Sequence, residues 1–118
     1  MPYSNELAAR IRDRFAKLKV EEVDEKRMMG GLCFMVDDKM CVGILGETLM
    51  CRIDPEEMPA ALGRPGCGRM ALTGRPMKGF VIVDPVGMES KADFDFWIGL
   101  ALEFNPRAKS SKKARRSP

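Results

Sequence analysis

Residues 73–80 are the part of this chain whose residue types best suit ligand binding, because two cations lie there beside two glycines. Backbone amides around Gly74 and Gly79 can form a nest for an anion, with Arg75 and Lys78 adding charge. A conformational interpretation also fits, in which the glycines and the proline between them make a turn and both cations face solvent. We predict an anion-binding or partner-binding loop at these four residues, with a plain turn as the alternative.

Cys67 is the thiol whose neighbours are most suited to chemistry. It lies in a glycine-rich stretch between Arg64 and Arg69, and nearby cations stabilise a thiolate. We predict a redox-sensing thiol at Cys67, with an ordinary loop thiol as the alternative.

The other three cysteines, Cys33, Cys41 and Cys51, fall in segments with a strand pattern. A turn at residues 46–47 is expected to put Cys41 and Cys51 on opposite faces of the sheet, because side chains alternate along a strand. The chain has no histidine, so we predict no metal and no cofactor. Ser4 and Ser90 precede helical segments and are predicted to cap them, so we expect no enzyme.

The composition is typical of one globular domain. The chain has 118 residues, of which 45% are hydrophobic and 31% charged, enough for a single core. The longest uncharged apolar run, residues 96–102, is far shorter than the about 20 residues that a bilayer requires. Charges interrupt the amino terminus, where a secretion signal would be apolar. We therefore expect a cytoplasmic protein without a membrane partner.

Charge is divided unevenly along the chain. Residues 107–118 contain six cations and no acid, whereas the other 14 cations face all 17 acids. We therefore expect an ordered domain at residues 1–106 and a disordered basic tail at 107–118. The tail cations are Arg107, Lys109, Lys112, Lys113, Arg115 and Arg116. They predict weak, sequence-independent binding of DNA or RNA, with a solubilising tail as the alternative.

Hydrophobic spacing predicts the elements. Residues 5–18 have the period of a helix, residues 24–53 that of three or four antiparallel strands, and residues 55–62 that of a short helix. Two further strands are expected at 70–73 and 80–84, before a last helix at 90–104. The order helix, strands, helix, strands, helix predicts a two-layer α+β fold with a mostly antiparallel sheet and flanking helices.

The register within residues 24–53 follows from hydrophobic consistency. A three-residue turn at Asp37, Asp38 and Lys39 gives the sheet one continuous apolar side. That side consists of Leu32, Phe34, Val36, Met40, Val42, Ile44, Leu49, Cys51 and Ile53. Ten methionines are present, and many lie in the strand region; their thioethers suit an adaptable partner surface, with ordinary core packing as the alternative.

The last helix is apolar over an arc of roughly 240° at 100° per residue, whereas packing on a sheet needs only about 100°. The face expected in the core holds Phe94, Ile98, Ala101 and Leu102. Phe96, Leu100 and Phe104 then need another cover, either the first helix or a second copy of the chain. A twofold contact is the commonest symmetry of soluble oligomers, so we predict a homodimer through these three residues.

Three motifs together resemble the amino-terminal domain of the TfoX/Sxy family. They are the glycine-glycine hairpin at Met29 to Val36, the strand with Leu49, Met50, Arg52 and Ile53, and the TGRPMKG segment followed by an aromatic residue at Thr73 to Phe80. The resemblance covers about residues 3–105. It implies a two-layer α+β fold similar to secretion-chaperone-like domains and a link to the regulation of natural competence.

We therefore expect a non-enzymatic regulatory or protein-interaction domain, related to transcription or competence, that acts through protein contacts. The alternative is a nucleic-acid-binding accessory protein that acts through the basic tail.

Overall fold

The fold is built on one six-stranded sheet in which every pair of neighbouring strands is antiparallel. The computed structural model describes residues 3–28, 30–72 and 75–108. The helices are α1 (Asn5–Lys17), α2 (Met58–Leu62) and α3 (Lys91–Phe104), with short 3₁₀ turns η1 (Pro55–Glu57), η2 (Pro85–Met88) and η3 (Asn105–Arg107). The strands are β1 (Val23–Met28), β2 (Gly31–Val36), β3 (Lys39–Leu45), β4 (Thr48–Arg52), β5 (Cys67–Leu72) and β6 (Arg75–Val83). The predicted α+β class and order of elements are confirmed.

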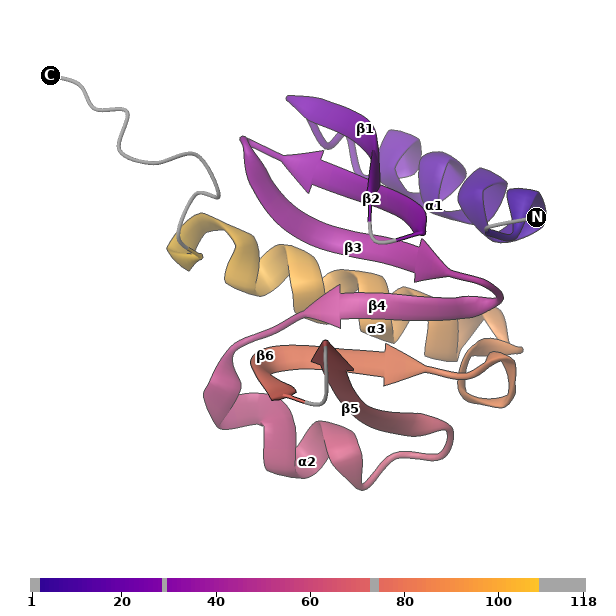
Figure 1. The fold of residues 1–118 in the computed structure, drawn as a ribbon. Coiled ribbons are helices and arrows are strands. Elements are labelled where there is room, and N and C mark those ends of the chain that lie inside the picture. Colours follow the sequence, from indigo (N-terminus) through magenta and orange to yellow (C-terminus); the bar gives the residue numbers. More distant parts are fainter. Residues whose placement is uncertain (1–2, 29, 73–74, 109–118) are drawn as a thin grey trace, which may run out of the picture.

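The strands lie in the order β1-β2-β3-β4-β6-β5, and α1 and α3 lie on the same face of the sheet (Figure 1). We call this the helix face. Its core includes Trp97 and Ile98 of α3 and Ile11 of α1, all fully buried. Phe15 of α1 meets Phe34 of β2 edge to face, with ring centroids 6.0 Å apart. Among the described residues, no helix is long and apolar enough to cross a membrane.

Both long helices begin at a serine that caps them, as predicted. Ser4 Oγ accepts a hydrogen bond from the Leu7 amide at 3.1 Å, and Ser90 Oγ accepts one from the Asp93 amide at 3.0 Å. Each bond satisfies an amide that the first helical turn leaves free. The two hydroxyls are therefore occupied in structural roles.

The predicted register is wrong at one strand. Asp37 and Asp38 both have positive φ, and Val36 pairs directly with Lys39, so the turn has two residues rather than three. Such turns favour aspartate because its short side chain tolerates the left-handed region. Met40 consequently points away from the helix face. A bulge in β3, where Cys41 is the extra residue opposite Phe34 and Met35 of β2, then restores the predicted side for the rest of β3.

The end of α3 is tied to the β2–β3 hairpin. Lys39 Nζ donates to the carbonyls of Asn105 at 3.2 Å and Pro106 at 3.4 Å. Asn105 Nδ2 donates in turn to the Val36 carbonyl at 3.3 Å. We call this set of bonds the C-terminal hook. It joins the η3 turn that follows α3 to the β2–β3 hairpin.

Candidate functional site

Most of the TGRPMKG segment belongs to strand β6, which begins at Arg75 rather than at residue 80 as predicted, and the structure describes only part of the segment. Gly74 and the side chain of Arg75 lie outside the described residues, while Lys78 is exposed. Gly79 has a φ of +85°, and its amide donates to Met58 Sδ at 3.1 Å. That amide is therefore occupied inside the protein, which supports a conformational role for Gly79. The anion-binding loop stays a prediction.

Cys67 is half-buried at the start of β5. Burial raises the pKa of its thiol, and the charge of Arg64 offsets this only in part. The effect of Arg64 on the pKa has the predicted direction, but it is smaller than the effect of burial. The redox role of Cys67 stays a prediction that must rest on its exposure rather than on a thiolate.

The other cysteines are divided between the two faces of the sheet. Cys41 and Cys51 share the core of the helix face, so the prediction that they lie on opposite faces is wrong. The bulge in β3 is the reason, because it places the extra residue Cys41 on the same side of the sheet as Val42. Cys33 lies on the other face, where burial raises its pKa to about 11. In the described part of the chain, no three or more His, Cys, Asp or Glu side chains form a group that could hold a metal.

The face of the sheet opposite α1 and α3 carries a second apolar cluster, which we call the methionine face. Its members are the buried Cys33, Met35, Met50, Met70 and Phe80 and the partly buried Met28, Met40, Leu45 and Ile82. Five of these residues come from β2, β4 and β6, which are inner strands of the sheet. The cluster therefore has a closed floor and a partly exposed apolar margin.

Two cations lie beside the methionine face. The Arg52 guanidinium lies over the Phe80 ring, 5.5 Å from its centroid, and burial lowers the pKa of Arg52. Lys26 is exposed on β1 opposite Cys33, and its charge favours the thiolate of that residue. Thioethers are flexible and polarisable, so this face can adapt to the shape of a partner.

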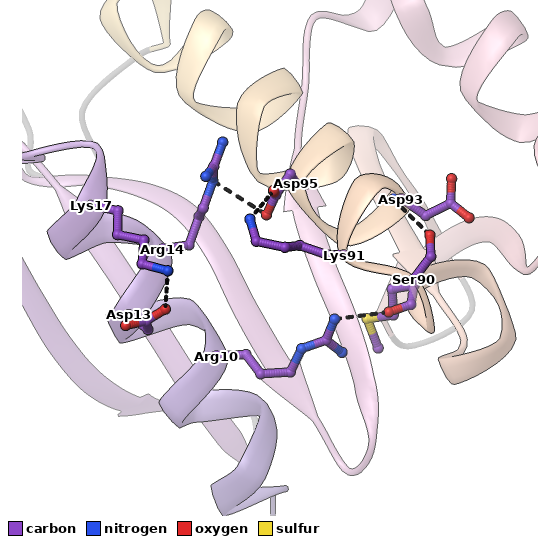
Figure 2. Close-up of polar contacts among 9 residues, drawn as sticks. Arg10, Asp13, Arg14, Lys17, Ser90, Lys91, Asp93 and Asp95 are labelled. Atoms are coloured by element: carbon purple, nitrogen blue, oxygen red, sulfur yellow. Dashed lines mark hydrogen bonds and ion pairs between the residues drawn. The ribbon is translucent and has the colours of Figure 1, made fainter.

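A groove lies between α1 and α3, and Figure 2 shows the charged side chains that the two helices contribute to it. It has a volume of about 410 Å³ and is lined by charged side chains from both helices. Arg10 lies 4.1 Å from the Phe94 ring centroid and donates to the Met88 carbonyl at 3.1 Å. Asp95 accepts from Lys91 at 2.7 Å and pairs with Arg14 at 3.3 Å.

The charges in this groove balance. Four cations and four acids line it: Arg10, Arg14, Lys17 and Lys91 against Glu6, Asp13, Glu89 and Asp95. Asp13 pairs with Lys17 at 3.5 Å within α1, and the Asp95 carboxylate is shared by cations of both helices (Figure 2). The groove is therefore a network that joins α1 to α3.

The predicted dimer residues on α3 differ in exposure. Phe96 is 37% exposed, whereas Leu100 is partly buried against the core of the helix face. Phe104 is also partly buried and lies 5.2 Å from the Arg107 guanidinium. The described ring contact and ion pair from α1 reach α3 at Phe94 and Asp95 rather than at these three side chains.

Of the predicted tail cations, Arg107 belongs to the folded part. Its Nη1 donates to Asp54 Oδ2 at 2.7 Å, which lowers the pKa of Asp54. Ala108 is 7% exposed. The remaining tail cations, Lys109, Lys112, Lys113, Arg115 and Arg116, lie outside the described residues.

Sequence reasoning did not find the arginine contacts that join separate elements. Arg10 meets Phe94, and Arg64 lies 3.8 Å from the Phe96 ring centroid. These pairs are separated by dozens of residues along the chain, and no local spacing predicts them. The unusual number of methionines was the only signal that pointed to the methionine face.

Comparison with known proteins gives one result. The model of the TfoX N-terminal domain family matches residues 13–105, which include all six strands and α3. Neither curated proteins nor solved structures gave a match. The match covers most of the 118 residues, and the chain belongs to the TfoX N-terminal domain family.

Proposed function

We propose that this protein is a non-enzymatic interaction domain with a regulatory role, and that it binds a protein partner through the methionine face. The observation that carries the proposal is the partly exposed apolar margin of this face, formed by Met28, Met40, Leu45 and Ile82. Helices α1 and α3 lie on the opposite side of the sheet (Figure 1), and an apolar patch that is open to solvent is a typical site for protein contact. Membership of the TfoX N-terminal domain family is consistent with this proposal, and we place the role in the cytoplasm.

The chemistry of the margin favours a partner whose shape the domain must follow. Methionine has three rotatable bonds and loses little in adjusting to a new surface. The floor beneath is closed to solvent, since Cys33, Met35 and Met50 are each at most 3% exposed, so a partner would contact the margin. Such a surface binds through shape and apolar area rather than through a fixed hydrogen-bond pattern.

We propose no catalytic role because the groups that catalysis would use have structural roles. Ser4 and Ser90 accept helix-capping bonds. Cys67 has a raised pKa. Five of the eight charged side chains in the groove between α1 and α3 form ion pairs with one another (Figure 2).

Affinity capture from the native host, with three forms of the full chain as bait, tests the proposal. Met40→Lys places a charge at the margin of the methionine face, and Leu18→Lys places the same charge on a 42% exposed residue at the end of α1. We expect the wild type and Leu18→Lys to retain the same partner and Met40→Lys to lose it. Far-ultraviolet circular dichroism checks that both variants fold.

Hydrogen exchange on the captured complex then locates the contact. We expect new protection in β3 and β4 beneath the margin. Retention of the partner by Met40→Lys, or protection confined to other elements, would contradict the proposal. In the host, loss of the partner should also remove the regulatory effect of the gene. In a strain that lacks the gene, we therefore expect Leu18→Lys to restore transcript levels and Met40→Lys not to restore them.

A further inference from the structure

The outward side of α3 carries a stripe of exposed residues, over which Arg64 lies at one end. Its members are Ala92, Phe96, Gly99 and Glu103. Their separations of three or four residues place them on one face of the helix. Phe96 is 37% exposed and projects from the stripe. A Cβ built on Gly99 would have nothing within 4 Å, so Gly99 leaves a notch one turn further along. The stripe thus contains one projection and one recess.

We propose that α3 packs antiparallel against α3 of a second copy about a twofold axis, with each Phe96 ring over the partner's Gly99. The two positions lie about 4.5 Å apart along the helix at 1.5 Å per residue. An axis through the midpoint between them brings each projection to a recess. A twofold contact uses the same patch on both copies and so must be complementary to itself, which this stripe is.

Charges on the two sides of the axis are also complementary. The Arg64 guanidinium lies over Phe96 and forms an ion pair with Asp93 at 3.5 Å, so it is placed beside the amino-terminal half of the stripe. Glu103 is exposed at the carboxy-terminal end, about 10 Å beyond Phe96. Antiparallel packing places Glu103 of the partner subunit next to Ala92, within reach of Arg64. Each dimer would contain this pair twice.

The contact is independent of the proposed partner surface. Helix α3 lies on the helix face of the sheet (Figure 1), and the methionine face lies on the other side. The structure also changes which predicted residues take part. Phe96 stays at the centre, whereas Leu100 and Phe104 are partly buried within the chain and lie at the border of the stripe.

Charge reversal in the full chain tests the proposal by sedimentation. Arg64→Glu and Glu103→Arg each put like charges on both sides of the axis, so we expect each variant alone to sediment at 13.2 kDa and the wild type at twice that mass, at micromolar concentration. Mixing the two variants restores opposite charges at both contacts. We therefore expect the mixture to form a heterodimer.

Gly99→Gln tests the recess separately. Glutamine is a better helix former than glycine, and the space around the Gly99 Cβ is open, so we expect a folded monomer. Folding of every variant is checked by circular dichroism; if Arg64→Glu fails to fold, Glu103→Arg and Gly99→Gln decide. A monomeric wild type, a dimer of Gly99→Gln, or a mixture without heterodimer would each overturn the proposal.

Discussion

The helix face of the sheet is filled by aromatic and branched side chains, whereas the methionine face is filled mostly by unbranched thioethers. Trp97, Phe34 and Ile98 are fully buried on the helix face between the sheet and its two helices. On the methionine face, Met35, Met50 and Met70 are at most 3% exposed although α1 and α3 lie on the opposite side of the sheet (Figure 1). Rigid side chains specify one packing, and flexible ones accept several. The difference indicates that one face holds the fold together and the other is free to adapt.

Removing the Trp97 side chain should have the largest effect on the free energy of unfolding. Trp97→Ala leaves a large cavity and deletes the hydrogen bond from Nε1 to the Gly87 carbonyl at 3.2 Å, so we expect a loss of about 3–5 kcal/mol in the free energy of unfolding. Urea unfolding followed by far-ultraviolet circular dichroism measures it, because the variant lacks the only tryptophan. Trp97→Phe, which keeps a ring, should lose less. A loss below about 2 kcal/mol for Trp97→Ala would show that the helix face is not rigid.

Leu49 and Met50 compare the two faces directly, because they are neighbours on β4 that point to opposite sides and are 0% and 1% exposed. We expect Leu49→Ala to cost about 3–4 kcal/mol and Met50→Ala about 2 kcal/mol, near the lower end of the range for such truncations. Neighbouring thioethers can move into the space that Met50 leaves. Equal losses in urea unfolding would remove the distinction between the faces.

Gly43→Ala examines the same point by adding volume. The new Cβ would lie 2.9 Å from Met50 Cε and 3.1 Å from the Leu32 carbonyl oxygen, so we expect a loss of about 1–2 kcal/mol from overpacking. In the double variant with Met50→Ala, the added methyl group fills part of the vacated space. The two losses should therefore sum to more than the loss of the double variant, by about 0.5 kcal/mol or more. Additive losses would mean that Met50 does not cover Gly43.

The smallest effect is expected from the ion pair that joins α1 to β1 at the border of the helix face. Arg12 donates two hydrogen bonds to Glu25, at 2.8 and 2.7 Å, and they lower the pKa of Glu25 from its ordinary 4.5. The side chains are 53% and 33% exposed, so the pair contributes less than about 1 kcal/mol.

Because the pKa of Glu25 is lowered by folding, its contribution is present above pH 4.5 and is lost as the pH falls through the folded value. Glu25→Gln should therefore be slightly less stable than the wild type at neutral pH and equally stable in acid. A stability difference that persists unchanged in acid would show that Glu25 acts through packing instead.

Local patterns predicted most elements of the fold because each depends on neighbours in the sequence. The capped helix at Asn5 and the tight turn at Gly46 follow from residue type and spacing, and both are present. The register of β3 could not be predicted in the same way. The two-residue turn at Asp37 and Asp38 shifts the register by one residue, and the bulge at Cys41 of β3 shifts it back. Only the two together leave the hydrophobic pattern beyond Cys41 unchanged.

The candidate surfaces were harder to predict than the fold because they depend on tertiary contacts. The stripe on α3 was found from its excess of apolar residues, but the sequence could not show that Arg64 would lie over Phe96. Nor could it show that the Cys67 thiol would be buried enough for desolvation to outweigh Arg64. Both outcomes depend on how α2 and β5 approach α3 and the sheet.

The C-terminal hook has a mechanical consequence. A load applied at Ala108 meets the bonds of Lys39 and Asn105 before it reaches the rest of α3. Those bonds anchor in the β2–β3 hairpin, so tension passes into the sheet instead of unwinding the helix one turn at a time. The C-terminal hook therefore passes a pulling force at this end of the domain to the sheet, and it isolates the packing around Trp97 from that force.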